Sequence, residues 1–301
     1  MKYLVAGPTI VNDILLADGS EKQQILGGSV YCVAGIKLWC DDCLYVSNVG
    51  PDFEQYYGAW MDANRLSREG LSFALPHTWY TRLIYGEAGL HSEVFRYGEK
   101  EETLLNEMDV ITARQIADSC TADTQGIYVE AVETSRLWDE LDVIRSVCSA
   151  KIMWEIPTSA ALDPERHSNV LKTIEKTDLF SINFPEAKAL LGVETRRQAV
   201  DRLLALGKPC FFRVGSQGAY MLADGEAAFA PSVTVGPVVD PTGCGNVSTA
   251  AALYGWCEGY TLQKTARLAN ISAAYNLLQY GPCPAVSEEM RHKAKELLRA
   301  D

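Results

Sequence analysis

The chain has 301 residues, of which 48% are hydrophobic and 22% are charged, and its formal net charge at pH 7 is -12. This composition is typical of a globular protein with a sizeable core, and the acidic balance argues against non-specific nucleic-acid binding, which needs a basic surface. No stretch approaches the ~20 apolar residues that a membrane span requires, and the first residues resemble a strand rather than a signal peptide.

Apolar segments rich in β-forming residues alternate with amphipathic segments along the chain. We predict strands at 3–6, 44–49, 126–129, 151–154, 179–182 and 210–214. We predict helices at 136–148, 165–176, 186–191, 196–206 and, from its small apolar residues, 247–256. This alternation predicts an α/β fold with a mostly parallel central sheet and helices on both faces. Ligands of such sheets gather at the carboxyl ends of the strands.

Two segments interrupt this alternation. Residues 10–27 contain a turn at 17–20, and residues 71–105 are rich in Thr, Tyr, Trp, Phe and Val around turns at 86–89 and 97–100. Both segments are predicted to form antiparallel hairpins.

The cysteines indicate a reducing environment. The chain has nine, an odd number, which fits reduced thiols in a cytoplasmic protein better than a disulfide framework. Cys40 and Cys43 have the spacing of a zinc or redox pair, but the sequence offers no second pair and no nearby histidine to complete such a site.

A glycine-rich turn precedes the predicted helix at 247–256. Gly243 and Gly245 lack the Cβ that would hinder a close approach to the backbone. The open N–H groups and the dipole of a helix N-terminus favour anions, so the turn suits a phosphoryl group that gains charge in a transition state. A helix entry that binds nothing is the alternative, since isolated Gly-x-Gly patterns are weak evidence.

The run at 240–246, Asp-Pro-Thr-Gly-Cys-Gly-Asn, resembles the second signature of the ribokinase-like (PfkB) family of carbohydrate and nucleoside kinases, Asp-Thr-x-Gly-Ala-Gly-Asp. The resemblance implies that Gly243, Cys244 and Gly245 hold the transferring phosphoryl group. The last Asp of the signature is the family's catalytic base, and in this chain that position is Asn246.

Other segments resemble the substrate-binding motifs of the same family, in the family's order. Residues 12–13 lie where the family keeps a substrate-binding Asp, and 27–32 is similar to its Gly-Gly-x-x-x-Asn loop with a Cys in the last position. A Glu directly after the strand at 126–129 takes the place of a carboxylate that binds a hydroxyl. The substrate-binding residues implied in this way are Asn12, Asp13, Gly27, Gly28, Cys32 and Glu130.

Three segments resemble the nucleotide side of the family's site. Residues 183–186 match its Asn-x-x-Glu motif, which is associated with magnesium and phosphate, and 213–218 resemble its Thr-x-Gly-x-x-Gly loop with Arg in the Thr place. A late Ala-Asn-x-x-Ala-Ala helix lies beside the adenine. The implied cofactors are ATP, Mg²⁺ bound by Glu186 through water, and a monovalent cation near Asp240. The implied cofactor-binding residues are Asn183, Glu186, Arg213, Gly215, Gly218 and Asn270.

Each motif also has a purely structural interpretation. Gly27 and Gly28 suit a hairpin or helix-entry turn. Asn183 and Glu186 suit a helix start, with Asn as the cap and Glu at the positive end of the dipole. Asn270 could satisfy a buried backbone group. The joint order of the segments favours the functional interpretation.

The resemblance spans the chain and implies a single domain, 1–301, with the ribokinase-like three-layer fold and a small β-lid formed by about 10–27 and 71–105. A lid of this kind excludes water, which competes for the phosphoryl group, and implies a homodimer. The implied reaction is ATP- and magnesium-dependent phosphorylation of a hydroxyl on a sugar, sugar-like alcohol or nucleoside. Cys32, together with Glu155 in place of an Asp common at that strand end, implies a specificity unlike that of ordinary ribokinases.

Asn246 leaves the proton acceptor open. An Asn side chain takes up no proton near neutral pH, and loss of a general base costs about 10²–10⁴-fold in rate. Either Asp13 or Glu130 takes the proton, or the acceptor is acidic enough to need little help, or the fold binds ligand without efficient turnover. The last possibility, a pseudokinase that acts as a ligand-binding or regulatory subunit, is the competing hypothesis.

Overall fold

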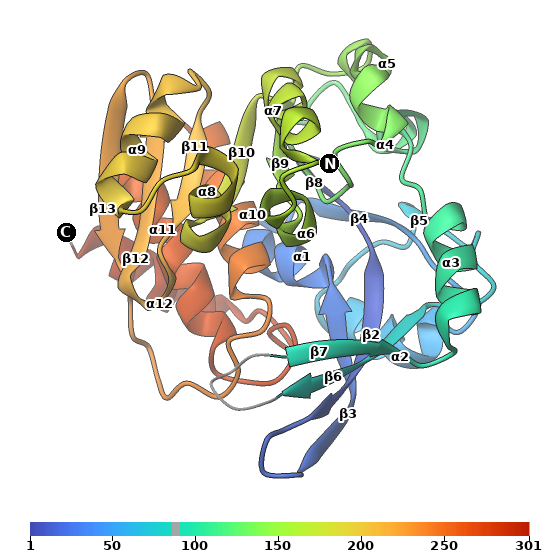
Figure 1. Ribbon diagram of the computed structural model, residues 1–301. Coiled ribbons are helices and arrows are strands. Elements are labelled where there is room, and N and C mark those ends of the chain that lie inside the picture. The colour runs from blue at the N-terminus through green and yellow to red at the C-terminus, as the bar shows by residue number, and fades with distance from the viewer. Residues whose placement is uncertain (86–90, 301) are drawn as a thin grey trace.

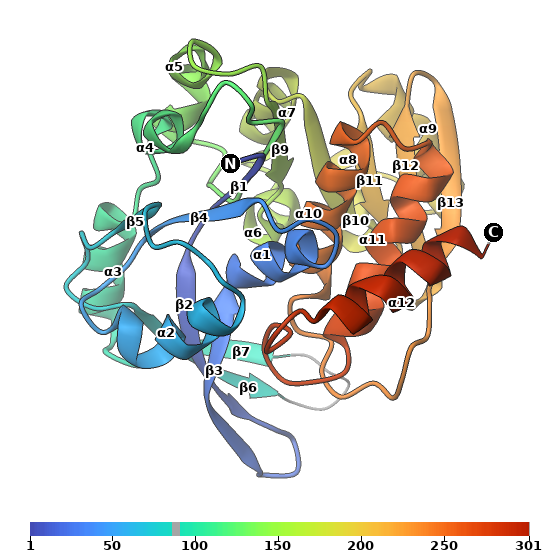
Figure 2. The same ribbon diagram turned by 180° about the vertical axis from the view of Figure 1, so that it is seen from behind.

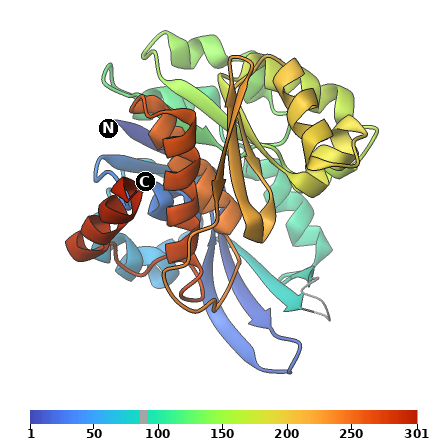
Figure 3. The same cartoon turned by 90° about the vertical axis from the view of Figure 1, so that its left-hand side faces the viewer.

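The computed structural model describes residues 1–85 and 91–300. A large sheet runs through the middle of the molecule, helices cover both of its faces, and a smaller sheet projects from the body (Figures 1 and 3). Within the described ranges the large sheet has nine strands and the small sheet has four. The predicted α/β class, a mostly parallel central sheet between helical layers with a small β-sheet beside it, is confirmed.

The large sheet is parallel except at one edge, where two strands pair antiparallel. The six strands predicted from the sequence are present to within one residue at each end, whereas the antiparallel edge pair was not predicted. In spatial order the strands are β13 (Glu226–Pro231), β12 (Gly218–Ala223), β11 (Cys210–Arg213), β10 (Leu179–Asn183), β9 (Lys151–Glu155), β8 (Gly126–Val129), β1 (Tyr3–Ala6), β4 (Cys43–Asn48) and β5 (Leu71–Ser72).

One helical layer, in front of the sheet in Figure 1, buries the side chains of alternate strand residues such as Ile127, Ile152 and Phe212. The predicted helix at 136–148 is two pieces, a 3-10 turn at Arg136–Asp139 and a short α-helix after Glu140. The helices on this side are α4 (Ala113–Ser119), α5 (Leu141–Arg145), α6 (Thr158–Leu162), α7 (His167–Lys176), α8 (Phe184–Leu191) and α9 (Arg196–Ala205).

The opposite layer, seen in Figure 2, buries the other set of strand side chains, including Tyr45 and Phe211. Its helices are α1 (Val30–Lys37), α2 (Phe53–Ala63), α10 (Cys244–Cys257), α11 (Leu262–Asn276) and α12 (Glu288–Arg299). Gly35 of α1 allows close packing against α10, since a Cβ at this position would lie 2.4 Å from the carbonyl oxygen of Val247. No helix among the described residues is long and apolar enough to cross a membrane.

The small sheet has the order β3 (Glu21–Gly28), β2 (Thr9–Leu15), β6 (Trp79–Tyr85) and β7 (His91–Phe95). β2 and β3 form the predicted hairpin of 10–27 and pair antiparallel, as do β6 and β7. The parallel pairing of β2 with β6 joins the two hairpins into one sheet. The turn predicted at 86–89 lies outside the described residues.

The turn predicted at 97–100 is shifted to 96–98 and leads into a helix instead of a second strand. Gly98 has φ 85° and is followed by α3 (Glu99–Met108). Three acidic residues occupy the first turn of α3, where they interact favourably with the positive end of the helix dipole. The segment 71–105 is therefore a hairpin followed by a helix.

Tyr57 of α2 ties the small sheet to the body. Its ring is fully buried, and its hydroxyl donates to the carbonyl oxygen of Ile10 at 2.6 Å. The same hydroxyl accepts from the backbone N–H of Gly27 at 3.2 Å. One oxygen thus links β2 and β3 to the helical layer.

We expect Tyr57→Phe to lower the free energy of unfolding by about 1–3 kcal/mol, since it leaves buried backbone groups without their partner. Urea denaturation followed by circular dichroism measures the change. Tyr56→Phe is the control, because the Tyr56 hydroxyl has no hydrogen bond among the described residues, and a loss as large in Tyr56→Phe would contradict the assignment.

Candidate active site

A cleft of about 910 Å³ lies between the small sheet and the carboxyl ends of four adjacent strands, β8 to β11. Glu130 follows β8, and Glu155, Asn183 and Arg213 are the last residues of β9, β10 and β11. All four line the cleft, together with Asn246 in the first turn of α10. Parallel strand order therefore brings residues far apart in sequence to one edge of the sheet, as expected for a ligand site.

An ionic and polar network occupies one end of this cleft. The Nη1 atom of Arg213 lies 2.9 Å from Oε1 of Glu155, and its Nη2 atom lies 3.9 Å from Oε2 of Glu186. The Tyr128 hydroxyl donates to Oε2 of Glu155 at 2.6 Å. The amide nitrogen of Asn246 lies 3.5 Å from both that carboxylate oxygen and the Tyr128 hydroxyl. Asn246 is therefore in contact with a carboxylate, although it is not one.

Gly243, the N-cap of α10, and Gly245, in its first turn, pack against side chains of the protein itself. A Cβ on Gly243, whose φ is 76°, would lie 2.3 Å from the Tyr31 ring, and a Cβ on Gly245 would lie 2.0 Å from Nη1 of Arg213. Residues 243–245 are partly exposed, but the residues that line the cleft include Asn246 and none of these three. Cys244 turns its sulfur toward the carbonyl oxygen of Ala273, at 3.7 Å.

Glu130 lines the cleft, and its carboxyl group has a raised pKa. Burial raises the pKa of Glu130 to about 7, opposed by a hydrogen bond from the Ser29 hydroxyl at 2.6 Å and reinforced by the charge of Glu155. A carboxylate that titrates near neutral pH has the property of a general acid or base.

Asn12 and Asp13 do not line this cleft. The Asn12 side chain is buried and accepts a hydrogen bond from Thr81 at 2.6 Å. The Asp13 carboxylate accepts from the Tyr80 hydroxyl at 2.8 Å and borders a separate hollow on the small sheet. Asp13 is thus placed apart from Asn246, whereas Glu130 shares its cleft.

Cys32 is also not among the residues that line the cleft, and its contact with a substrate stays a prediction. Cys32 belongs to α1, and its side chain is fully buried, as are all eight residues of this helix. Gly27 and Gly28 end β3 and lead into this helix. A Cβ on Gly28, at φ 73°, would lie 2.3 Å from the carbonyl oxygen of Pro8. Glycine is therefore needed at this turn for steric reasons, as the structural interpretation of the motif expects.

Asn183 and Glu186 both cap a helix and line the cleft, so the structural and the functional interpretation of their motif are compatible. They form a capping box at the start of α8, in which the Asn183 side chain accepts from the Glu186 N–H and the Glu186 side chain accepts from the Asn183 N–H. The other Glu186 oxygen accepts from Thr158 at 2.7 Å. Both residues nevertheless line the cleft, so the cap holds two oxygen-bearing side chains at its wall.

The loop at 213–218 is exposed in its middle and anchored at its end. Gly215 is exposed with φ 64°, whereas a Cβ on Gly218 would lie 2.1 Å from the carbonyl oxygen of Ala230. Asn270 of α11 donates to that oxygen at 2.8 Å and to the carbonyl oxygen of Pro231 at 3.1 Å. Asn270 therefore satisfies buried backbone groups beside this loop.

Asp109 is a cleft residue that the motifs did not indicate. Its carboxylate accepts from the indole N–H of Trp79 at 2.6 Å and from Asn48 at 3.1 Å, and burial raises its pKa. Trp79 lines the same cleft. Asp109 directly follows α3 and lies four residues beyond the segment 71–105 that was predicted to be a hairpin, and no motif of the sequence marks it.

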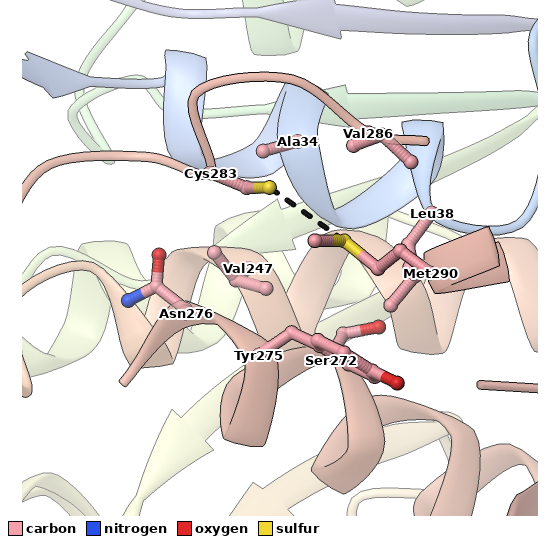
Figure 4. Close-up of a pocket in the computed structure, with 9 residues that line it drawn as sticks. All are labelled: Ala34, Leu38, Val247, Ser272, Tyr275, Asn276, Cys283, Val286 and Met290. Carbon is pink, nitrogen blue, oxygen red and sulfur yellow. Dashed lines mark hydrogen bonds between the residues drawn. The ribbon is translucent and has the colours of Figure 1, made fainter. Parts of the chain in front are cut away.

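A second pocket lies behind Val247, on the face of α10 that is turned toward α1, α11 and α12 (Figure 4). The Cys283 and Met290 sulfur atoms are 3.7 Å apart at its side. Its volume of about 10 Å³ leaves room for one water molecule at most. The larger cleft is therefore the candidate site.

The described part of the chain contains no cluster of three His, Cys, Asp or Glu side chains that could together hold a metal ion. All nine cysteines are free thiols, including Cys40 and Cys43.

Comparison with known proteins identifies similar sequences and folds. Residues 155–289 match the model of the pfkB family of carbohydrate kinases. An uncharacterised sugar kinase of Archaeoglobus fulgidus is 29% identical over 166 residues, which are 50% of this chain and 65% of that protein.

Two solved structures of low sequence identity share the fold over nearly the whole chain. The Burkholderia thailandensis nucleoside kinase in complex with inosine has a TM-score of 0.75 and 17% identity, with 99% of this chain and 96% of that chain covered. A putative ribokinase II from E. coli in complex with ATP and Mg²⁺ has a TM-score of 0.75 and 17% identity, with coverage of 100% and 99%. The resemblance to the ribokinase-like (PfkB) family is thus confirmed: the family's domain matches residues 155–289, and the ribokinase-like fold extends over the whole chain.

Proposed function

We propose that the protein is a kinase that transfers the terminal phosphoryl group of ATP, with Mg²⁺, to a hydroxyl of a sugar, sugar-like alcohol or nucleoside. The observation that carries the proposal is the row of polar strand ends in one cleft, from Glu130 to Arg213. The match to a carbohydrate kinase family and the inosine and ATP–Mg²⁺ complexes of structural neighbours support it.

Under this proposal, each reactant lies beside a different part of the row of strand ends. Glu130 and Asp109 lie toward the small sheet and present carboxylates to the acceptor hydroxyls. Asn183 and Glu186, at the third strand, supply oxygen atoms of the kind that bind Mg²⁺ or its water shell, and they fit such an ion. Arg213 and the exposed part of its loop border the nucleotide.

The chain's own groups perform three tasks in this arrangement. The small sheet forms the wall opposite the strand ends and excludes water from the acceptor. Glu130 orients an acceptor hydroxyl through charge-assisted hydrogen bonds. The cation of Arg213 offsets phosphate charge. Bound Mg²⁺ supplies charge neutralisation between the phosphates.

A monovalent cation beside Asp240 belongs to the same proposal. One oxygen of Asp240 accepts from the N–H and the hydroxyl of Thr242, at 3.0 and 2.7 Å. The other oxygen is buried and has no hydrogen-bond partner among the described residues, and the same holds for the side-chain oxygen of Asn276. Such orphaned oxygens are costly unless a ligand satisfies them. We further propose a cytoplasmic homodimer that associates through the small sheet.

The first prediction concerns Asn246. We expect the natural protein to form ADP in an acceptor-dependent manner, and Asn246→Asp to change the rate by less than about tenfold, because a carboxylate already lies beside this position. A coupled assay for ADP against a panel of sugars and nucleosides measures both rates. Turnover by Asn246→Asp alone would instead identify the natural protein as a pseudokinase, and failure of both forms to bind ATP with Mg²⁺ would exclude both functions.

The second prediction concerns the titration of Glu130. Because its folded pKa of about 7 lies above the ordinary value of 4.5, the folded state retains a proton that the unfolded state loses. The free energy of unfolding contributed by Glu130 is therefore present below pH 4.5 and decreases as the pH rises to about 7, by up to about 3 kcal/mol.

Glu130→Gln should remove this dependence, so that the variant gains stability relative to the natural protein as the pH rises. Urea denaturation at pH 5 and pH 8 measures the difference. Glu107→Gln, at an exposed carboxylate, serves as the control, and a pH dependence in Glu130→Gln equal to that of the natural protein contradicts the shifted pKa.

The third prediction concerns the cation. Replacing tetramethylammonium by K⁺ at constant ionic strength should raise the melting temperature of the natural protein by a few degrees and leave that of Asp240→Asn unchanged. Differential scanning fluorimetry gives the comparison, and equal responses of the two proteins would rule out a cation at Asp240.

A further inference from the structure

Arg213 crosses a neighbouring strand to reach its partner. It is the last residue of β11, Glu155 is the last residue of β9, and β10 lies between them. The guanidinium of Arg213 therefore lies over the end of β10, where its Nη1 atom is 2.9 Å from Glu155 and occupies the space beside Gly245. A cation is thus placed against the first turn of α10, at the position predicted to hold the transferring phosphoryl group.

The guanidinium of Arg213 is shared between more than one acidic side chain, and a bound phosphate would be a further partner for it. Two carboxylates, Glu155 and Glu186, lie near one guanidinium, and their side chains are only 11% and 2% exposed. The Nε atom of Arg213 is buried and has no hydrogen-bond partner among the described residues. The planar fork of Arg binds phosphate oxygens with paired hydrogen bonds. A phosphate beside Arg213 therefore competes with Glu155 for the same donors.

Glu155 is the carboxylate nearest to the position where the family signature has its acid. Its Oε2 atom lies 3.5 Å from the amide nitrogen of Asn246. Its strand pairs with β8 so that Glu155 and Glu130 follow a directly paired position, Trp154 with Val129. An acceptor hydroxyl held by Glu130 is thus adjacent to Glu155 across two neighbouring strand ends.

We propose that Glu155 and Arg213 together replace the missing acid, an inference that rests on the proposed kinase function. Arg213 binds the transferring phosphoryl group and, in doing so, frees Glu155 from its ion pair. Glu155 then accepts the proton of the acceptor hydroxyl. The acceptor O–H bond breaks, the acceptor oxygen bonds to the γ-phosphorus, and the bond from that phosphorus to the β–γ bridging oxygen breaks, so that ADP departs with its electron pair. Glu155 returns the proton to solvent.

The first test measures nucleotide affinity and needs no turnover. Isothermal titration of the natural protein and of Arg213→Thr with ATP and with ADP, both with Mg²⁺, should show a loss of ATP affinity at least about tenfold larger than the loss of ADP affinity. Arg213→Lys, which keeps the charge without the fork, should lie between the two. Equal losses for ATP and ADP, or no loss, overturn the assignment of Arg213.

A matched control separates this effect from damage to a buried ion pair. Arg166 and Glu133 form a comparable pair, 2.6 Å apart, and the Glu133 side chain is 2% exposed. Neither residue lines the cleft. Glu133→Gln should lower stability about as much as Arg213→Thr and leave both nucleotide affinities unchanged.

The second test asks which carboxylate takes the proton. Glu155→Gln should keep its affinity for ATP and lose about 10²–10⁴-fold in phosphoryl transfer to the best acceptor of the panel. Adding Asn246→Asp to Glu155→Gln should restore transfer, since an acid again stands beside the acceptor. A Glu155→Gln protein with the natural rate, or a protein with Glu155 intact that transfers the phosphoryl group only after Asn246→Asp is introduced, overturns the assignment of Glu155.

The outcomes also separate this inference from the proposed function. If the natural protein neither binds ATP nor forms ADP, the kinase function itself fails. If ATP binds and is transferred regardless of Arg213→Thr and Glu155→Gln, the kinase function stands and only the role of the ion pair is refuted.

Discussion

The candidate site depends on the guanidinium of Arg213, which lowers the free-energy cost of burying two carboxylates. Glu155 and Glu186 lie at the ends of β9 and at the start of α8, and Arg213 from a third strand end lies within 2.9 and 3.9 Å of them. Burying a carboxylate without a partner is strongly unfavourable. Arg213 is the charged partner of Glu155, whereas Glu186 is held mainly by hydrogen bonds from the Asn183 N–H and the Thr158 hydroxyl. The same cation fills the space that Gly245 leaves open. The geometry of α10, β9 and β11 is thus coupled through a single guanidinium.

Much of the architecture could be predicted from the sequence because continuous apolar segments of this length are typical of buried strands. The strands that end near Glu130, Asn183 and Arg213 are continuous apolar segments, so the convergence of their carboxyl ends at one edge follows from α/β topology. The hairpin of β2 and β3 followed from a turn between β-forming residues. In contrast, α3 was missed because its acidic first turn follows a glycine that equally suits a hairpin.

The side-chain arrangement of the site was less predictable, for physical reasons that differ between residues. The motif placed Cys32 at a substrate position, but α1 is buried on every side, and the packing that buries Cys32 comes from elements distant in sequence. The contact of Arg213 with Glu155 depends on a rotamer that crosses a strand, which no spacing rule encodes. The capping role of Asn183 and Glu186 was predictable because it is local. Asp109 required knowledge of the tertiary contact with Trp79.

The close contact between α1 and α10 has a consequence for the dimensions of the site. The hydroxyl of Ser29, the residue before α1, holds Glu130, and the first turn of α10 carries Asn246. Because Gly35 touches the backbone of Val247, the separation of these two helices is set by the absence of a single methyl group. A larger side chain at Gly35 would push α1 and α10 apart. It would thereby increase the separation between Glu130 and Asn246, although Gly35 itself contacts neither reactant.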